Sequence, residues 1–175
     1  MQWNKEMNAG NQFWQVVFDE LPTTLDVLRG LPQANLQEPY YAAALLIPAL
    51  CHWSANKNVA LDIINYLKGP HAVSIREIQF VDERLQGKAY LPFSYFEGAT
   101  PENGYEPSRP FIVKIFIVPT SFNEAGYAKL YLKSSGADSP RPVQLRKKTS
   151  SGEWFLWEQM LLSEIRPPVS ADPWQ

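Results

Sequence analysis

The chain has 175 residues, of which 45% are hydrophobic and 19% charged, and its formal net charge is −2. This composition is typical of a globular protein and excludes a disordered or collagen-like chain. The single cysteine excludes an intrachain disulfide, and the longest apolar run, residues 40–50, is shorter than the ~20 residues that span a bilayer. We therefore expect one domain, residues 1–175, in a soluble protein of the cytoplasm.

The first part of the chain is predicted to be helical. Residues 1–10 are polar, and we expect a loose N-terminus there. Residues 11–87 form the predicted helical half, with four to five helices. The first of these is predicted over residues 11–18, because Phe13, Trp14, Val17 and Phe18 recur at a spacing of three to four.

Helix-capping residues mark the beginnings of the four helices that follow. Each is a Ser, Thr or Asn before an apolar stripe, or a proline in the first turn, and Ser74 with Glu77 forms a capping box. The expected starts are Thr23 or Thr24, Glu38 with Pro39, Asn56 or Asn58, and Ser74.

The pattern changes twice in the second half. Residues 88–110 form a long loop that is rich in proline and aromatic residues, and such loops are either functional or packed down by their own side chains. After Pro110 the period becomes two, which predicts a β half over residues 111–160, followed by a Pro-rich tail over residues 161–175. The predicted strands are 111–118, 127–133, 142–148 and 154–159.

Helices followed by about four strands in an antiparallel meander predict the α+β class, with helices packed on one face of the sheet. The order of the elements is similar to that of the cone-shaped NTF2-like folds.

Several segments together resemble a known family. They are Ala49–Cys51, Asn65–Pro70, Phe93–Tyr105, Lys133–Pro142, Trp154–Glu158, Ile165–Pro168 and Asp172–Trp174. Over roughly residue 38 to the C-terminus, the sequence resembles uncharacterised bacterial proteins that are common in Gram-positive gut anaerobes and are described as a domain of unknown function. The resemblance implies a bacterial cytoplasmic protein and carries over no activity, cofactor or site residue.

Catalytic and metal-binding chemistry finds little support in the residues. Cys51 and His52 are neighbours on a predicted helix, where adjacent side chains point about 100° apart, so they do not form a nucleophile–base pair. One cysteine with only two histidines, His52 and His71, is a poor basis for a zinc site. We therefore predict no catalytic residue, no metal site and no cofactor, which favours a protein that is not an enzyme.

Positive charge is concentrated in one segment. Residues 110–148 carry seven basic and two acidic side chains, although the whole chain is acidic. If the second and third strands pair as their alternation suggests, one face of the sheet gathers basic and aromatic side chains that suit a polyanion. These residues are Tyr127, Lys129, Tyr131, Lys133, Arg146 and Lys148. A simpler interpretation is the solvated face that an antiparallel sheet needs.

Three hypotheses of function follow. The first is a non-catalytic interaction module that offers a protein partner the basic face, the tail or the aromatic loop, in which Tyr95, Phe96 and Tyr105 are candidates. The second is a small-molecule site or cryptic enzyme with a pocket between helices and sheet. The third is polyanion binding at the basic face, although the overall acidity argues against nucleic acid. The residues do not indicate the oligomeric state.

Overall fold

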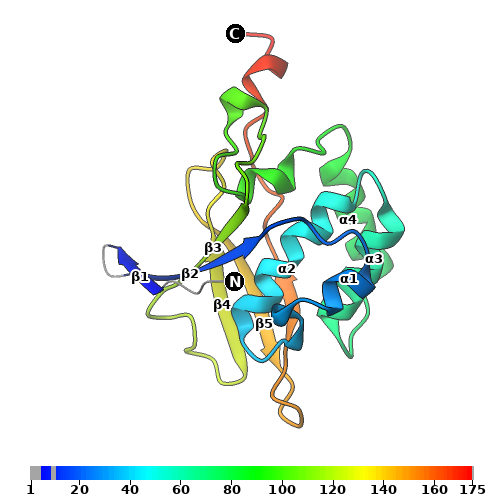
Figure 1. Ribbon diagram of the computed structural model, residues 1–175, viewed down its shortest axis with the longest axis vertical. Coiled ribbons are helices and arrows are strands. Elements are labelled where there is room, and N and C mark those ends of the chain that lie inside the picture. The colour runs from blue at the N-terminus through cyan, green and yellow to red at the C-terminus, as the bar shows by residue number, and fades with distance from the viewer. Residues whose placement is uncertain (1–4, 9–10, 175) are drawn as a thin grey trace.

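The computed structural model describes residues 5–8 and 11–174, and it places one antiparallel sheet beside a layer of helices (Figure 1). The strands follow one another in the order β1-β2-β3-β4-β5-β6, which is a meander. The strands are β1 Lys5–Asn8, β2 Asn11–Phe18, β3 Phe111–Ile117, β4 Tyr127–Leu132, β5 Arg141–Lys147 and β6 Trp154–Gln159. The α-helices are α1 Leu25–Arg29, α2 Pro39–His52, α3 Lys57–Lys68 and α4 Ile75–Leu85. The α+β class is therefore confirmed, and the likeness to an NTF2-like cone stays a prediction.

The helix predicted over residues 11–18 is wrong, because this segment is strand β2. Trp14, Val16 and Phe18 alternate toward the helices, and β-branched and aromatic residues suit a pleated surface. The strand pairs antiparallel with β3, for example Val16 with Val113, so a partner far along the chain decides its conformation. Of the N-terminus predicted to be loose, residues 5–8 form β1, and residues 1–4 and 9–10 lie outside the described part.

The other four helix starts are confirmed. The hydroxyl of Thr24 accepts from the Val27 N–H at the start of α1, and the Asn56 side chain accepts from the Val59 N–H at the start of α3. Pro39 occupies the first turn of α2, where its missing N–H removes no helical bond. Ser74 and Glu77 form both bonds of the capping box at the start of α4. Local capping chemistry thus fixes the helical layer.

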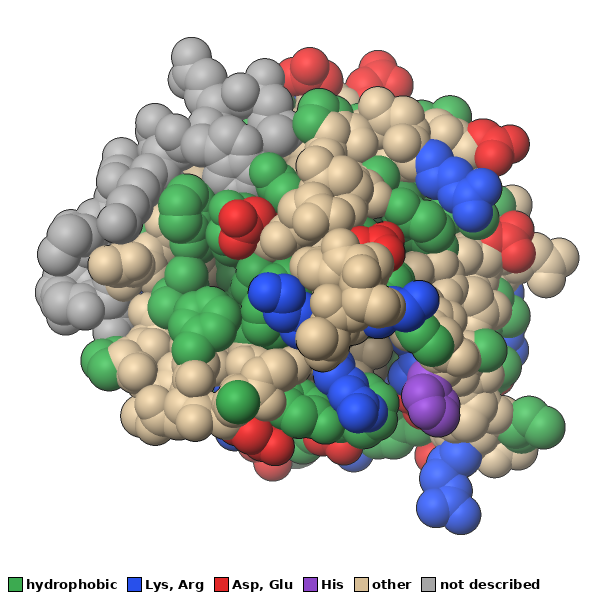
Figure 2. All heavy atoms as spheres, turned by 90° about the horizontal axis from the view of Figure 1, so that it is seen from below, with side chains coloured by type: hydrophobic (Ala, Val, Ile, Leu, Met, Phe, Trp, Pro, Cys, Tyr) green, Lys and Arg blue, Asp and Glu red, His purple; other side chains and the backbone are tan. Residues whose placement is uncertain are grey.

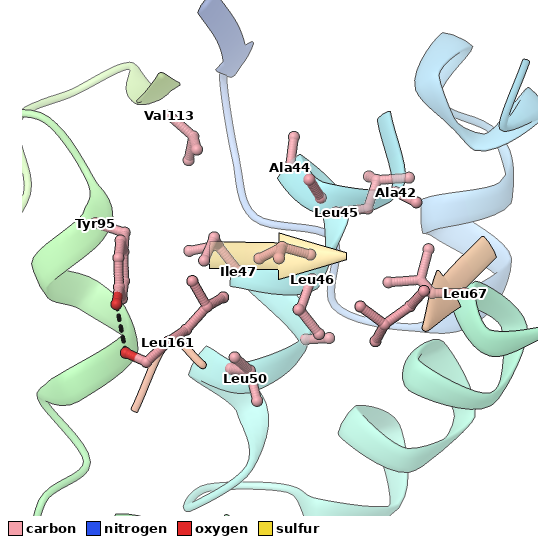
Figure 3. Close-up of a cluster of buried hydrophobic side chains, with 14 of the residues drawn as sticks. Ala42, Ala44, Leu45, Leu46, Ile47, Leu50, Leu67, Tyr95, Val113 and Leu161 are labelled. Carbon is pink, nitrogen blue, oxygen red and sulfur yellow. Dashed lines mark hydrogen bonds between the residues drawn. The ribbon is translucent and has the colours of Figure 1, made fainter. Parts of the chain in front are cut away.

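Helix α2 is the centre of the core. Every residue from Ala42 to Leu50 is buried, and the helix contacts α3 on one side and β3 to β6 on the other. Figure 3 shows Leu45, Leu46 and Ile47 of α2 among side chains from the surrounding elements. These apolar side chains fill the space between the helices and the inner face of the sheet.

The segment 161–166 after β6 holds other parts of the chain through its backbone carbonyls. The Tyr95 hydroxyl donates to the Leu161 carbonyl (Figure 3), and the Tyr105 hydroxyl donates to the Arg166 carbonyl at 2.6 Å. Arg141 donates to the carbonyls of Ser163 and Glu164 at 3.0 and 3.3 Å. The Pro-rich tail then contains one short 3-10 turn, Val169–Ala171.

Candidate binding surface

The face of the sheet that points away from the helices is the candidate surface, and the strand register assembles it. In β4, Ala128, Leu130 and Leu132 are buried against the helices, so the residues between them point outward. Tyr127 lies opposite Arg146, and Lys129 lies opposite Gln144. The structure therefore brings together five of the six residues predicted for this face, all except Lys148. We call Tyr127, Lys129, Tyr131, Lys133 and Arg146 the outer sheet face.

Arg146 is the most constrained cation of this face. Its guanidinium carbon lies 5.5 Å from the ring centroid of Tyr127 and 4.7 Å from that of Trp157. The two rings contact each other edge-on, with centroids 6.1 Å apart. Contacts of this kind attract a cation electrostatically.

Sequence reasoning missed Trp157, which lies at a β-bulge in β6. Gln144 pairs with Glu158 and Leu145 pairs with Leu156, so Trp157 is the extra residue between two ladder pairs. Bulges redirect side chains in this way. Trp157 also meets the imidazole of His71 edge-on, at 6.0 Å between centroids. A regular alternation along β6 does not reveal this cluster.

Lysines at the other end of the outer sheet face also lie over aromatic rings. The Lys133 ammonium is 4.5 Å from the ring centroid of Phe116, which is opposite Tyr131 across the strand pair. The Lys114 ammonium is 5.2 Å from the ring of Phe13, but it also forms an ion pair with Glu97 at 3.3 Å. Lys114 is thus partly neutralised, whereas Lys133 is not.

The cations of the outer sheet face have no acidic partner among the described side chains. Within the described residues, Lys129, Lys133 and Arg146 form no ion pair, and neither do Lys147 and Lys148. The ion pairs that are present join Lys57 to Asp82, Lys68 to Glu77, Lys114 to Glu97 and Arg166 to Asp138. The outer sheet face therefore keeps its positive charge available.

A pocket of about 370 Å³ lies where β5 ends and β6 begins, beside the turn that joins them. Figure 1 places this turn at the lower end of the molecule, and Figure 2, which looks at that end, shows Lys and Arg side chains gathered there with a His side chain beside them. The polar side chains of the lining include His71, Arg146, Lys147, Lys148 and Thr149. Lys148 follows the end of β5, so it belongs to this pocket more than to the outer sheet face.

The chain after α3 supplies the wall that faces β6. Gly69 ends α3 with φ +62°, and a Cβ at this position would lie 2.4 Å from the ring of Phe155. Only glycine allows so close an approach with this backbone conformation. This contact places Pro70 and His71 beside β6, where they form one wall of the pocket.

The three candidates in the aromatic loop do not lie on a surface. Tyr95, Phe96 and Tyr105 are 4%, 2% and 2% exposed, so their assignment to an exposed binding surface is corrected. Phe96 packs on Phe111, and Tyr105 stacks on Tyr90 at 5.4 Å between centroids. Burial is the main cause of the raised pKa of Tyr95 and of Tyr105. Of the two alternatives predicted for this loop, the structure shows the second, a loop packed down by its own side chains.

The residues considered for catalysis have structural surroundings. Burial raises the pKa of the Cys51 thiol, which disfavours the thiolate that a nucleophile needs. His52 Nε2 donates to the Pro22 carbonyl at 2.6 Å. In the described part of the chain, no group of three or more His, Cys, Asp or Glu side chains is placed to hold a metal ion. Nor does any helix described there have the length and apolar character that crossing a membrane requires.

A family model described as "Domain of unknown function (DUF6935)" matches residues 20–169. The chain belongs to the DUF6935 family. The match begins at residue 20, before the region near residue 38 where the resemblance was expected to start, and it includes β3 to β6 and all four α-helices. The matched region thus contains the whole outer sheet face and the whole pocket lining. No curated protein and no solved structure matches the chain.

Proposed function

We propose that this DUF6935 domain is a non-catalytic interaction module that binds an acidic segment of a partner protein on its outer sheet face. The supporting observation is that Lys129, Lys133 and Arg146 share this face and form no ion pair with any described side chain. Complementary charge raises association rates and selects partners, and an acidic segment is the complement of this face.

The rings of this face favour a protein partner over nucleic acid. Proteins that bind single strands leave aromatic rings free for the bases to stack on. Here Arg146 lies over Tyr127 and Trp157, and Lys133 lies over Phe116, so cations already occupy ring faces. The whole chain is also acidic, with a sequence pI of about 5.7, which weakens attraction to a polyanion at long range.

The test is binding of a fluorescent peptide rich in Asp and Glu, measured by anisotropy with the full chain. We expect saturable binding that weakens with salt, and a loss of about tenfold or more in the variant Lys129→Glu/Arg146→Glu. Arg76→Glu/Lys88→Glu is the matched control, because it makes the same change in net charge at exposed positions of the helical layer. Equal losses in both variants, or tighter binding of a single-stranded oligonucleotide than of the peptide, would contradict the proposal.

We further propose that residues 1–175 form one domain of a bacterial cytoplasmic protein. The pairing of β2 with β3 and the packing of α2 on β3 to β6 support a single unit. The bacterial and cytoplasmic assignments rest on the family resemblance and on the single, half-buried cysteine.

A further inference from the structure

We propose that the pocket beside the β5–β6 turn binds a phosphate monoester, that is, a phosphate group attached to a small organic group. This site is separate from the acidic-segment binding proposed above and does not depend on it. The two share only Arg146, which lies where the outer sheet face meets the pocket.

Basic side chains line the pocket from two parts of the chain. Arg146, Lys147 and Lys148 come from the end of β5, and His71 comes from the segment after α3. Among the described residues, no Asp or Glu side chain lines the pocket, and its remaining cation, Lys68, is neutralised by an ion pair with Glu77. A phosphate monoester carries about −1.5 to −2 charges near neutral pH, which matches three available cations better than a carboxylate does.

Arg146 contacts two aromatic rings without any ligand. Its guanidinium carbon lies 5.5 Å from the ring centroid of Tyr127 and 4.7 Å from that of Trp157, and its N–H groups have no described acceptor. The planar fork of arginine suits two oxygens of one phosphate group. A donor that is already fixed loses less conformational entropy on binding, so this arrangement favours recognition of an oxyanion.

The turn contributes side chains more than backbone donors. The N–H groups of Lys148, Ser151 and Gly152 already donate to carbonyls within the turn, at 2.8, 3.3 and 2.8 Å. The hydroxyl of Thr149 lines the pocket and can donate to a phosphate oxygen. Recognition at this end of the sheet therefore depends on Arg146, the two lysines and Thr149.

The volume of the pocket indicates that an organic group can bind together with the phosphate. A space of about 370 Å³ exceeds what one phosphate group needs. The apolar part of the lining includes Pro70, Phe155 and Trp157, against which a small organic group can pack. The organic group can belong to a free metabolite-sized phosphate ester or to a phosphorylated side chain of a protein.

The experiment is an NMR titration of the full, isotope-labelled chain, following backbone amides and the Trp indole signals. The probes are glycerol phosphate, a phosphoserine peptide, the same peptide without phosphate, and sodium chloride at matched ionic strength. We expect saturable shifts at Lys147, Lys148, Thr149 and the Trp157 indole with at least one phosphate ester. Comparison of the two esters distinguishes the small-molecule source from the phosphorylated side chain.

Two variants locate the site. Lys147→Gln/Lys148→Gln should weaken binding of the phosphate ester about tenfold or more, since charge-assisted contacts are lost. Lys129→Gln/Lys133→Gln should leave it within about twofold, because those side chains do not line the pocket. Shifts no larger than those with sodium chloride, or equal weakening in both variants, would overturn the proposal. Loss of acidic-peptide binding in the second variant alone would leave this result unaffected, so the two proposals can fail separately.

Discussion

The aromatic loop over residues 88–110 and the outer sheet face contain the same kinds of residue and use them in opposite ways. In the loop, the hydroxyls of Tyr95 and Tyr105 donate to backbone carbonyls, and their rings are buried. Tyr127 of the outer sheet face and the neighbouring Trp157 are half-buried, and Arg146 lies over both rings. The comparison teaches that a high aromatic content does not by itself mark a binding surface. The role of an aromatic residue depends on which groups contact its ring and its polar edge.

The largest expected effect is a difference between the two regions in how much a substitution lowers the free energy of unfolding. Tyr105→Ala should lower the free energy of unfolding by about 3–5 kcal/mol, because it removes a fully buried ring and its hydrogen bond to Arg166. Tyr131→Ala on the outer sheet face should cost about 1 kcal/mol or less, since that ring is only half-buried. Urea denaturation of both variants gives the comparison. Similar losses would show that the loop and the face do not differ in this way.

A smaller change isolates the hydroxyl. Tyr95→Phe keeps the ring but leaves the Leu161 carbonyl without its donor, and we expect a loss of about 1–2 kcal/mol in unfolding free energy. Tyr127→Phe is the matched control, because its ring contacts are kept and no described hydrogen bond is removed. An unchanged midpoint for Tyr95→Phe in denaturant would mean that the ring alone anchors the loop.

The ion pair between Lys68 and Glu77 in the helical layer should make the stability of the fold depend on pH. Burial by itself raises the pKa of the Glu77 carboxyl, but hydrogen bonds from Lys68 and Ser74 together lower it below the ordinary 4.5. A lowered pKa in the folded state adds stability that is present above pH 4.5 and is lost as the pH falls through the folded value.

Glu77→Gln should therefore be less stable than the original chain near neutral pH, by under about 1 kcal/mol because the carboxyl is partly exposed. The difference should shrink as the pH falls below 4.5. Thermal unfolding of both proteins across this range provides the measurement. A difference that stays constant with pH would mean that the charge of Glu77 does not contribute.

The smallest effect concerns the outer sheet face itself. Lys129→Ala and Lys133→Ala should each change the unfolding free energy by no more than about 0.5 kcal/mol, because both side chains are exposed and form no described ion pair. Differential scanning calorimetry can detect larger changes. A substantial loss would show that these lysines stabilise the fold and would weaken their assignment to binding.

What could be predicted depends on the distance between the residues that decide each feature. The capping box of Ser74 and Glu77 lies within one turn, so it is visible in the sequence. The outer sheet face followed from alternation within β4 and β5, which are close neighbours along the chain. Strand β2 was missed because β3, which pairs with it, begins at Phe111.

The remaining misses have the same physical origin. The acceptors for Tyr95 and Tyr105 lie 66 and 61 residues further along the chain, so nothing near the loop indicates that its rings are buried. Trp157 and His71 come from β6 and from the segment after α3, which the close approach at Gly69 brings beside β6. Such contacts arise from tertiary packing and have no local pattern.

The segment 161–166 has a consequence for how sequences in this family can change. Its carbonyls at Leu161, Ser163, Glu164 and Arg166 accept the hydrogen bonds that hold Tyr95, Arg141 and Tyr105. A carbonyl is the same whatever side chain its residue bears, so substitution here preserves every acceptor. An insertion or deletion moves one acceptor relative to the others. Across DUF6935 proteins, we therefore expect this stretch to conserve its length more strictly than its residue identities.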